Sequence, residues 1–399
     1  MASQVYFTGL RAGFDNSLLT KIERLASAAG LKKIVRQKDL AAVKLHFGER
    51  GNTAFVRPML VRPVVDALLK AGARPFVTDT GTLYIGSRSN AVDHLNTALL
   101  NGFAYPVIGA PLIIADGIDG ADEVAVQVNM KHFREVFIAT AIVHADSLIS
   151  VAHFKLHDGS GIGGAIKNLG MGAASRKGKM AQHAGVAPQV IVEKCTGCGT
   201  CLEQCAHGAV ALSKRSEKSE RSEMVEKIPT PPALSAPTAA AARVSRIDPD
   251  LCVGCARCFH ACPQQAISID WEYKDKDHSK FIEKMVEYAC GALRGKEKRS
   301  LFINFLTQIS PACDCYPFAD APIVSDIGVA ASTDPVAIDQ ACADMVNRRP
   351  HLETSCLGEI AGPCPDKIRA VYPDIDWRRQ LIYASQLGLG STEYELVEI

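Results

Sequence analysis

Short apolar runs alternate with segments of helical periodicity along the first part of the chain. Residues 4–11, 40–48 and 74–81 are apolar and rich in β-forming residues, whereas residues 17–35 and 58–73 repeat their apolar positions at helical spacing. The same alternation continues through the segments that follow. Alternating strands and helices of this kind predict a parallel sheet that is covered by helices.

The last third of the chain carries the same two patterns. Residues 279–294 and 334–349 have helical spacing, and residues 300–310 and 321–332 are apolar enough to be buried strands. Since these strands can complete the sheet of the first part, the stretch between the two parts is predicted to be an insertion. The expected fold class is α/β, with a mostly parallel sheet flanked by helices.

Composition and charge narrow the class of protein. A chain of 399 residues, of which 47% are hydrophobic, can bury one large core and a small second one, which predicts two domains. The formal net charge of +1, with no basic stripe interleaved with aromatic residues, argues against a nucleic-acid partner. No apolar run reaches the roughly 18 residues that span a bilayer, and the N-terminus lacks the pattern of a signal peptide. We therefore expect a soluble cytoplasmic protein without a membrane partner.

Eight of the fourteen cysteines fall into two runs of identical spacing. The runs are Cys195, Cys198, Cys201 and Cys205, and Cys252, Cys255, Cys258 and Cys262. Both follow the pattern CxxCxxCxxxC of bacterial ferredoxins, which bind [4Fe–4S] clusters through cysteine thiolates. Zinc or disulfides are the alternatives, but tetrahedral zinc needs close pairs of cysteines rather than four in a row repeated twice. The sequence therefore predicts two [4Fe–4S] clusters and a reducing compartment.

The resemblance to two-cluster bacterial ferredoxins covers roughly residues 190–271 and implies how the ligands are shared. In that family the fourth cysteine of each run binds the other cube. The implied sets are Cys195, Cys198, Cys201 and Cys262 for one cluster, and Cys252, Cys255, Cys258 and Cys205 for the other. Ala206 stands where the family usually has proline, and the loop between the two halves is longer than a compact ferredoxin needs.

The expected domain boundaries follow from this insertion. Residues 1–190 and 272–399 form the two parts of the α/β body, and residues 191–271 form an inserted α+β ferredoxin-like domain. Residues 213–245, between the two runs, are first balanced in charge and then rich in Pro and Ala, with almost no large apolar residues. Such a segment buries too little surface to offset its ordering entropy, so a flexible excursion is predicted there.

Outside the cysteine runs, four segments resemble the family known as domain of unknown function 362. They are VKLHFGERGN, TDTGTLYIGSR, FKLHDGSGIGGAIKNLGMG and CDCYPFADAPIVSDIGVAASTDPVAIDQA. The resemblance covers most of residues 1–190 and 272–370, and members of this family often carry an inserted ferredoxin module. It implies the architecture and leaves the reaction open.

Two predicted strand ends in the first part carry candidate catalytic residues. His46 follows one strand, and Asp79 ends another, with Tyr84 and Arg88 in the loop after it. Ligand sites of open α/β sheets collect at the carboxyl ends of the strands, so these side chains can converge on a site. A structural histidine and ordinary loop hydrogen bonding are the alternatives.

The segment from Lys155 to Asn168 predicts an anion site. Lys155 and His157, both candidate catalytic residues, stand before a glycine-rich loop that leads into a helix-like stretch, and amides at such helix starts bind phosphates or other anions. The candidate ligands of a phosphate-bearing cofactor such as FMN, or of an anionic substrate, are Gly159, Gly161, Gly163, Gly164, Lys167 and Asn168. The segment is neither a P-loop nor a GxGxxG motif. A glycine-rich turn with solvated lysines is the alternative.

Six cysteines lie outside the two runs. They are Cys290, Cys313, Cys315, Cys342, Cys356 and Cys364. Most are expected to be small buried residues. Cys313 and Cys315 differ, because flanking prolines hold the two thiols close together just after a predicted strand; soft-metal ligation, a redox thiol pair and packing alone are the options. Asp334 is predicted to cap a helix that has proline in its first turn.

The leading hypothesis from the sequence is a redox enzyme, with or without the help of a flavin. Two clusters would pass single electrons to a site in the α/β body that includes His46, Asp79, Lys155, His157, Lys167, Cys313 and Cys315. A redox partner protein and a small-molecule substrate are the expected partners. An electron carrier or scaffold whose body only docks a partner is the first rival. A non-redox metal or anion enzyme with structural or sensory clusters is the second.

Overall fold

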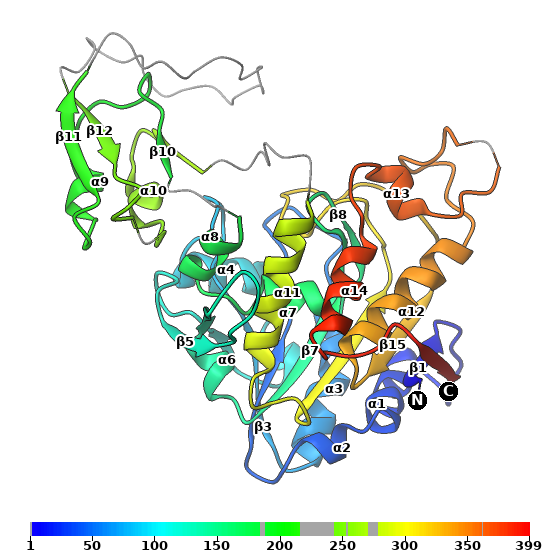
Figure 1. Ribbon diagram of the computed structural model, residues 1–399. Helices are drawn as coiled ribbons and strands as arrows, with labels where there is room; N and C mark the ends of the chain where they lie inside the picture. The colour runs from blue at the N-terminus through cyan, green and yellow to red at the C-terminus, as the bar shows by residue number, and fades with distance from the viewer. Residues whose placement is uncertain (1, 184–187, 216–242, 253, 270–277, 361) are drawn as a thin grey trace. The chain divides into compact units, whose positions relative to one another are not determined.

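The chain divides into two compact units. The computed structural model describes residues 2–183, 188–215, 243–252, 254–269, 278–360 and 362–399. One unit, called the body, comprises Met1–Gln182 and Tyr273–Ile399, and the other, called the cysteine unit, comprises His183–Glu272. The body is therefore built from two stretches of chain that come from either side of the cysteine unit (Figure 1).

An eight-stranded sheet forms the centre of the body. Its strands, in spatial order, are β16 (Tyr394–Glu398), β1 (Ser3–Gly9), β15 (Gly328–Ser332), β14 (Ser300–Leu306), β7 (Ser147–His153), β2 (Leu40–Lys44), β3 (Arg74–Asp79) and β4 (Leu112–Ile114). Only β15 runs antiparallel to its neighbours β1 and β14, and every other pair is parallel. The predicted mostly parallel sheet is confirmed. The prediction that strands of the last third complete it is confirmed as well, because β14 and β15 lie between β1 and β7.

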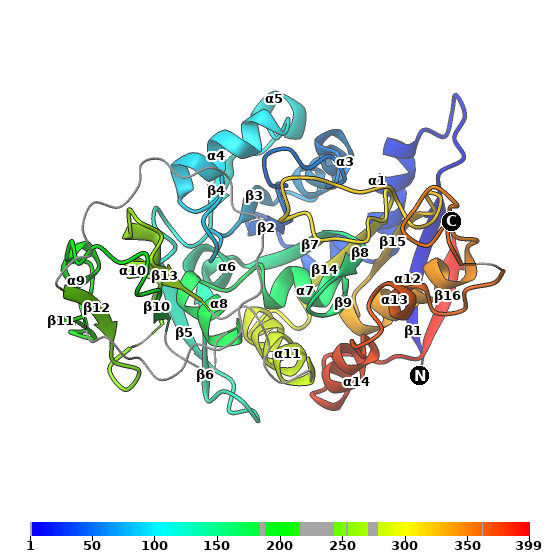
Figure 2. The ribbon, with the colours of Figure 1, turned by 90° about the horizontal axis from the view of Figure 1, so that it is seen from above.

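Helices cover both faces of this sheet (Figure 2). One face packs against α1 (Leu18–Ala28), α2 (Leu31–Ile34), α3 (Pro58–Lys70), α4 (Ala91–Leu100) and α5 (Tyr105–Ile108). The other face packs against α6 (Thr140–His144), α7 (Ala165–Gly170), α11 (Ser279–Leu293), α12 (Pro335–Arg348), α13 (Lys367–Val371) and α14 (Arg378–Gln386). Neighbouring strand residues face opposite cores: Leu148 and Phe302 belong to one, and Ile149 and Ile303 to the other. Strands buried on both faces explain the near-continuous apolar runs in the sequence.

Local sequence signals set several helix ends. The helical pattern of residues 17–35 splits into α1 and α2 because Gly30 adopts a left-handed conformation, with φ of 95°. The predicted cap at Asp334 is confirmed: its carboxylate accepts hydrogen bonds from the amides of Val336 and Ala337, both at 2.9 Å. Pro335 occupies the first turn, where its missing N–H costs nothing.

Other elements were not predicted from the pattern. A hairpin of β5 (Glu123–Gln127) and β6 (Glu135–Ala139) precedes α6, and the C-terminal strand β16 pairs with β1. The apolar run 321–332 forms a strand only in its last five residues. None of the helices in the described part of the chain has the length and apolar character needed to cross a bilayer.

The cysteine unit consists of two similar halves. The first half holds β10 (Gln189–Val190), α9 (Thr200–Glu203) and β11 (Val210–Lys214), and the second holds β12 (Arg243–Ile247), α10 (Arg257–Ala261) and β13 (Ile267–Ser268). Each cysteine of the second run follows its counterpart by 57 positions, as Cys252 follows Cys195.

The strand pairing of the two halves repeats with the same offset. Val190 pairs with Ile267, and Val210 pairs with Ile247, so the strand before each run pairs with the strand after the other run. Because each half pairs with the other in the same way, the two halves are related by a pseudo-twofold axis.

The predicted flexible excursion 213–245 needs a correction at both ends. Ser213 and Lys214 pair with Val244 and Arg243 in the hairpin of β11 and β12, so the ends of the segment are strands. The remainder of the excursion, residues 216–242, lies outside the described residues.

Candidate functional site

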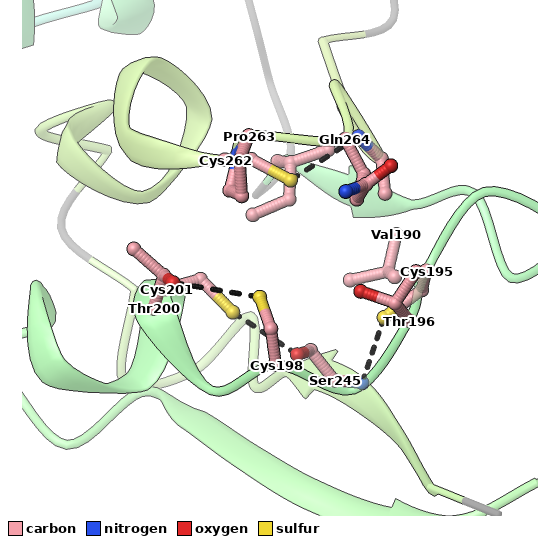
Figure 3. A pocket seen from close by; sticks show the side chains of 12 residues that line it. Val190, Cys195, Thr196, Cys198, Thr200, Cys201, Ser245, Cys262, Pro263 and Gln264 are labelled. Atoms are coloured by element: carbon pink, nitrogen blue, oxygen red, sulfur yellow. Dashed lines mark hydrogen bonds between the residues drawn. The ribbon is translucent and has the colours of Figure 1, made fainter. Parts of the chain in front are cut away.

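The eight cysteines of the two runs surround two separate cavities. Each cavity takes three cysteines from one run and the fourth from the other. The first set is Cys195, Cys198, Cys201 and Cys262, and the second is Cys252, Cys255, Cys258 and Cys205. Figure 3 shows the sulfur atoms of the first set around a common space. These are the two sets that the ferredoxin resemblance implies.

The two runs share an unusual backbone geometry. Gly197 and Gly254 have positive φ angles of 66° and 69°, and the next matching pair, Gly199 and Ala256, have φ angles of 83° and 58°. Glycine adopts this region without strain, whereas the alanine has a side chain that opposes it. The loop that carries the first three cysteines therefore folds in the same way twice.

Backbone amides approach the sulfurs at matching places. The amide of Ala209 lies 3.3 Å from the sulfur of Cys205, and that of Ala266 lies 3.2 Å from the sulfur of Cys262. Each amide is four residues past the cysteine it contacts. Donors of this kind stabilise thiolates and adjust the potential of a cluster.

Each cavity offers four thiols, which is the kind and number of donor that a [4Fe–4S] cube binds. Among the residues that the structure describes, no three His, Cys, Asp or Glu side chains gather closely enough to hold one metal ion. The four thiolates around a [4Fe–4S] cube bind different irons, so they stand further apart than the ligands of one ion. Burial, with the thiols of Cys255 and Cys252 nearby, raises the pKa of Cys258 to about 12, so binding a cluster has to displace its proton.

A second constellation lies at the carboxyl ends of the central strands of the body. Lys44 is the last residue of β2, Asp79 ends β3, and His153 ends β7. The hairpin of β8 (Lys155–His157) and β9 (Gly161–Gly163) follows β7, and the loop with the two cysteines follows β14. These ends share one edge of the sheet, as ligand sites of open α/β sheets do.

A buried ion network fixes the ends of β2 and β3. The Asp79 carboxylate lies 3.0 Å from the Lys44 ammonium and 3.3 Å from the Arg88 guanidinium. Burial would raise the pKa of Asp79, but Lys44 and the other cations around it hold it below its usual value. The Tyr84 hydroxyl lies 2.5 Å from Arg88, so the predicted convergence of Asp79, Tyr84 and Arg88 is confirmed.

His46 stands between this network and the cysteine loop. Its Nδ1 accepts a hydrogen bond from the Gly48 amide at 2.9 Å, and the ring is half-buried. Burial, followed by repulsion from Arg88, lowers the pKa of His46 to about 3. The neutral ring can therefore offer its other nitrogen as a proton donor at neutral pH.

The loop after β2 holds the cysteine loop in place. The Glu49 amide donates to the Asp314 carbonyl at 3.0 Å, and the Asn52 side chain donates to the carbonyls of Tyr316 and Phe318 at 3.2 and 2.8 Å. The Tyr84 hydroxyl lies 3.1 Å from the Cys315 carbonyl. All four hydrogen bonds end on main-chain carbonyls of the cysteine loop, so they fix its backbone independently of its side chains.

Asp314, between the two cysteines, points into the body. Its two carboxylate oxygens lie 2.8 Å from His153 Nδ1 and 2.8 Å from Lys155 Nζ. Burial would raise the pKa of Asp314, but His153 and Lys155 hold it well below its usual value. The aspartate thus anchors the turn that carries the two thiols.

The Cys313 thiol is surrounded by donors. The Cys313 sulfur accepts a hydrogen bond from the Cys315 amide at 3.4 Å and lies 3.9 Å from Lys167 Nζ. The His157 side chain also donates a hydrogen bond to it. The hydrogen bond from the Cys315 thiol, with Lys167 and His157, holds the pKa of Cys313 well below its usual value. The same bond and burial raise the pKa of Cys315. The pKa values of the two thiols are therefore shifted in opposite directions.

The predicted phosphate site at the glycine-rich segment stays a prediction, but the start of the helix that follows it already has an anionic partner. The first amides of α7, Ala165 and Ile166, already donate to the buried carboxylate of Asp339 at 2.7 and 2.9 Å. A side chain at Gly164 would lie within 2.2 Å of the same carboxylate, so the glycine serves this close approach.

The other predicted phosphate ligands are also engaged. The amides of Gly159 and Ser160 donate to His157, and Gly161, with φ of 74°, packs against Trp377. Gly163 packs against the aliphatic parts of two lysine side chains. The Asn168 amide group binds the Lys44 ammonium and carbonyl. Of the predicted anion ligands, Lys167 alone is directed at the thiols.

Sequence reasoning identified the thiols but missed much of what surrounds them. Lys44, Glu49, His153 and Asp314 were not singled out. A lysine and a histidine inside the apolar runs LAAVKL and SLISVAHF were the available signals, because a charged or polar residue is rarely buried in a strand without a partner.

Comparison with protein families gives a clear result. The model of the family described as Domain of unknown function (DUF362) matches residues 41–344, which is more than half of the chain. The chain belongs to the DUF362 family. The match includes β2, β3, β7 and β14 and both candidate sites, so the family membership extends over the residues described above. None of the curated proteins matches the chain.

One solved structure has a partial likeness to this DUF362 chain. It is the lactate racemase apoprotein from Thermoanaerobacterium thermosaccharolyticum, with 14% sequence identity and a TM-score of 0.30. The match covers 46% of this chain and 41% of that chain, so it spans less than half of either. A likeness of this size carries no argument about function.

Proposed function

We propose that this protein is an iron–sulfur oxidoreductase. Its cysteine unit holds two [4Fe–4S] clusters, and electrons from them are used one at a time at a redox site in the body. The observation that carries this proposal is the sharing of ligands: each of the two cavities draws three cysteines from one run and the fourth from the other. When bound, such clusters supply single electrons at low potential.

The chemistry of the body supports a redox site rather than a docking surface. Cys313 lies 3.9 Å from Lys167 Nζ and two residues from Cys315, at the edge of the sheet where open α/β folds bind ligands. The buried ion pairs, and the hydrogen bonds from the loop after β2 to the main chain of the cysteine loop, keep these groups in fixed positions. A reacting centre requires such fixed positions. A protein that only docked a partner would need none of these arrangements.

The proposal is tested by anaerobic purification, followed by iron, sulfide and released-flavin quantitation on the same sample. An electron paramagnetic resonance spectrum after dithionite reduction completes the measurement. About eight irons per chain together with a flavin supports an electron-fed reductase. About eight irons alone favours the electron carrier or scaffold, and about twelve places a third cluster at Cys313 and Cys315. Fewer than about two irons after reconstitution contradicts the proposal.

Matched variants locate the iron. Cys201→Ser and Cys258→Ser each remove a buried ligand from a different cavity, so each is expected to lose about half of the iron or more. Cys356→Ser is the control, because Cys356 is exposed and lies in the body. If the variants and the control keep the same iron content, the cavities are not the cluster sites.

A non-redox role for the body is distinguished by a separate observation. Activity that is the same with reduced and oxidised clusters favours structural or sensory clusters. Oxidation of reduced clusters on addition of a substrate favours the reductase.

A further inference from the structure

The turn that carries Cys313 and Cys315 is shaped for a bond between the two sulfurs. The Tyr316 amide donates to the Cys313 carbonyl at 3.1 Å, which closes a β-turn over residues 313–316. A turn of this kind keeps the two cysteine Cα atoms well under the ~7 Å limit for a disulfide. The Cys315 amide lies 3.4 Å from the Cys313 sulfur, so the turn folds back on the first cysteine. The pair therefore reaches bonding distance without any large movement of the backbone.

The two sulfurs differ in access. Cys313 is only 3% exposed, whereas Cys315 is half-buried. An external molecule thus meets Cys315 first. The donors around Cys313, which are Lys167, His157 and the Cys315 amide, stabilise negative charge on the inner sulfur. Cys315 is thus the accessible sulfur, and Cys313 is the sulfur on which negative charge is stabilised.

We propose that Cys313 and Cys315 cycle between a dithiol and a disulfide and thereby reduce a small disulfide substrate. Cys315 forms the bond with the substrate, and Cys313 is the sulfur that resolves it. This inference rests on the proposed function in one respect: the electrons that restore the dithiol come from the clusters of the cysteine unit. The thiol chemistry itself needs no cluster.

Atoms and electrons balance over three steps. The Cys315 sulfur, its proton passing to Cys313, attacks the substrate disulfide RSSR, forms Cys315–S–S–R and releases RS⁻, which takes the proton. The Cys313 thiolate then attacks the Cys315 sulfur, closes the internal disulfide and releases a second RS⁻, which takes a proton from solvent. Two electrons, delivered singly, and one proton then break the internal bond to one thiolate and one thiol. The sum is RSSR with two electrons and two protons giving two RSH.

The surroundings of Cys313 determine which sulfur leaves when the internal disulfide opens. A thiolate of low pKa is the better leaving group when a disulfide opens, and the attacked sulfur is the accessible one. When an external thiolate opens the internal disulfide, it attacks Cys315 and expels Cys313, where Lys167 and His157 receive the charge. Reduction of a substrate follows the same path in reverse.

Trapping of the mixed disulfide tests the assignment of the two sulfurs. Oxidised glutathione is the probe, and peptide mass spectrometry is the readout. In the wild-type protein we expect an internal disulfide between residues 313 and 315 with no glutathione retained there. In Cys313→Ser, glutathione accumulates on Cys315, and in Cys315→Ser, Cys313 reacts at least tenfold more slowly. Cys356, exposed in the body, provides the internal reference for reactivity.

Equal labelling of Cys313 and Cys315 in the single variants overturns the assignment. The wild-type protein decides the main point without any variant, because it either forms the internal disulfide or does not. If the internal disulfide does not form, the proposal is wrong even when the variants fold poorly.

A charge variant tests the stabilisation of Cys313. Lys167→Met removes the cation nearest to the inner sulfur, so at a fixed ratio of reduced to oxidised glutathione the pair shifts toward the disulfide by about tenfold in equilibrium constant, or about 30 mV. Lys32→Met, on an exposed lysine of α2, is the matched control and leaves the ratio unchanged. An unchanged ratio in Lys167→Met shows that the donors do not stabilise the thiolate.

A final comparison separates this proposal from the proposed function. Oxidised wild-type protein and Cys258→Ser are given a reduced viologen, and free thiols at 313 and 315 are counted. Recovery of the thiols in the wild type alone supports both proposals. If glutathione exchange occurs but the viologen restores no thiols, the thiol pair stands and the electron route fails. If the clusters are redox-active but no internal disulfide forms, the proposed function stands and the thiol pair fails.

Discussion

Asp314 shows how strongly a single side chain can determine the candidate site. Its carboxylate is fully buried between His153 and Lys155, and its backbone carbonyl is held by the Glu49 amide. Such a residue contributes little by its charge pairs alone, since burying ions is costly. Its removal matters more, because it leaves the buried charge of Lys155 without a partner.

Replacing Asp314 by Asn is therefore expected to destabilise the body by about 3 kcal/mol, because Lys155 would keep its buried charge without a partner. Urea unfolding followed by circular dichroism measures the change. Asp374→Asn, on an exposed aspartate of the body, is the control and should change stability by less than about 0.5 kcal/mol. A similar small change in both variants would contradict the role of Asp314 as the partner of the buried Lys155 charge.

Ala256 offers a second test at the residue scale. It has a φ of 58° where the matching residue of the first run is Gly199. Ala256→Gly relieves the left-handed strain but makes the unfolded chain more flexible, so a net gain of about 0.5 kcal/mol is expected. The urea midpoint for loss of the cluster absorbance measures it. Ala261→Gly, in α10, should instead lower that midpoint, and the same sign in both variants would contradict the strain argument.

At the scale of elements, α11 contacts both the β5–β6 hairpin and α14 through the carboxylate of Glu283. Glu283 contacts Lys131 at 2.7 Å and His132 at 2.5 Å from the hairpin loop, and it also pairs with Arg379 of α14. Burial would raise the pKa of Glu283, but hydrogen bonds from Lys131, Arg379 and His132 lower it to about 2. The helix thus holds the β5–β6 hairpin and α14 by ionised contacts.

This lowered pKa predicts a dependence of stability on pH. Because the folded pKa lies below the unfolded value of 4.5, the contribution is complete above about pH 4.5 and is lost as the pH falls toward 2. Glu283→Gln should therefore cost about 1–2 kcal/mol at pH 7, after allowance for solvent screening, and less as the pH falls below 4. Thermal unfolding at several pH values measures it. A difference between the variant and wild type that is constant from pH 7 to 3 would rule this out.

The sequence predicted some elements well and others poorly, for physical reasons. Strands buried on both faces, such as β2 and β14, read as apolar runs and were found. The hairpin β5–β6 was missed because its half-exposed residues show no such run.

The candidate site divides in the same way. The spacing of the eight cysteines is local, so it was readable, and so were Cys313 and Cys315. The capture of the α7 amides by Asp339 was not, because it joins residues 174 positions apart and only the tertiary fold brings them together.

At the scale of the whole molecule, the two units differ in what holds them together. The body has two large apolar cores, one on each face of the sheet. In the described part of the cysteine unit the apolar core is small: one cluster has Cys195, Val244 and Ala266 as its buried members, and a few further residues such as Val210, Phe259 and Ile267 are buried as well. A core of that size stabilises a unit only with the help of metal or cross-links.

Cluster removal should therefore affect one unit and spare the other. After oxidative destruction of the clusters and chelation of the iron, we expect the transition of the cysteine unit to disappear and that of the body to keep its midpoint within about 2 °C. Differential scanning calorimetry before and after the treatment checks both. A single transition that moves as a whole would mean that the units fold cooperatively.

The position of β1 in the sheet has a consequence for biosynthesis. Both of its neighbours, β15 and β16, follow it in the chain by more than 300 residues. During synthesis β1 therefore has no partner strand until β15 is made, and the whole cysteine unit, residues 183–272, is made before β15. On the proposed function, clusters can enter that unit before the sheet of the body has closed, and a chain halted short of β15 would carry a folded cysteine unit beside an unfinished body.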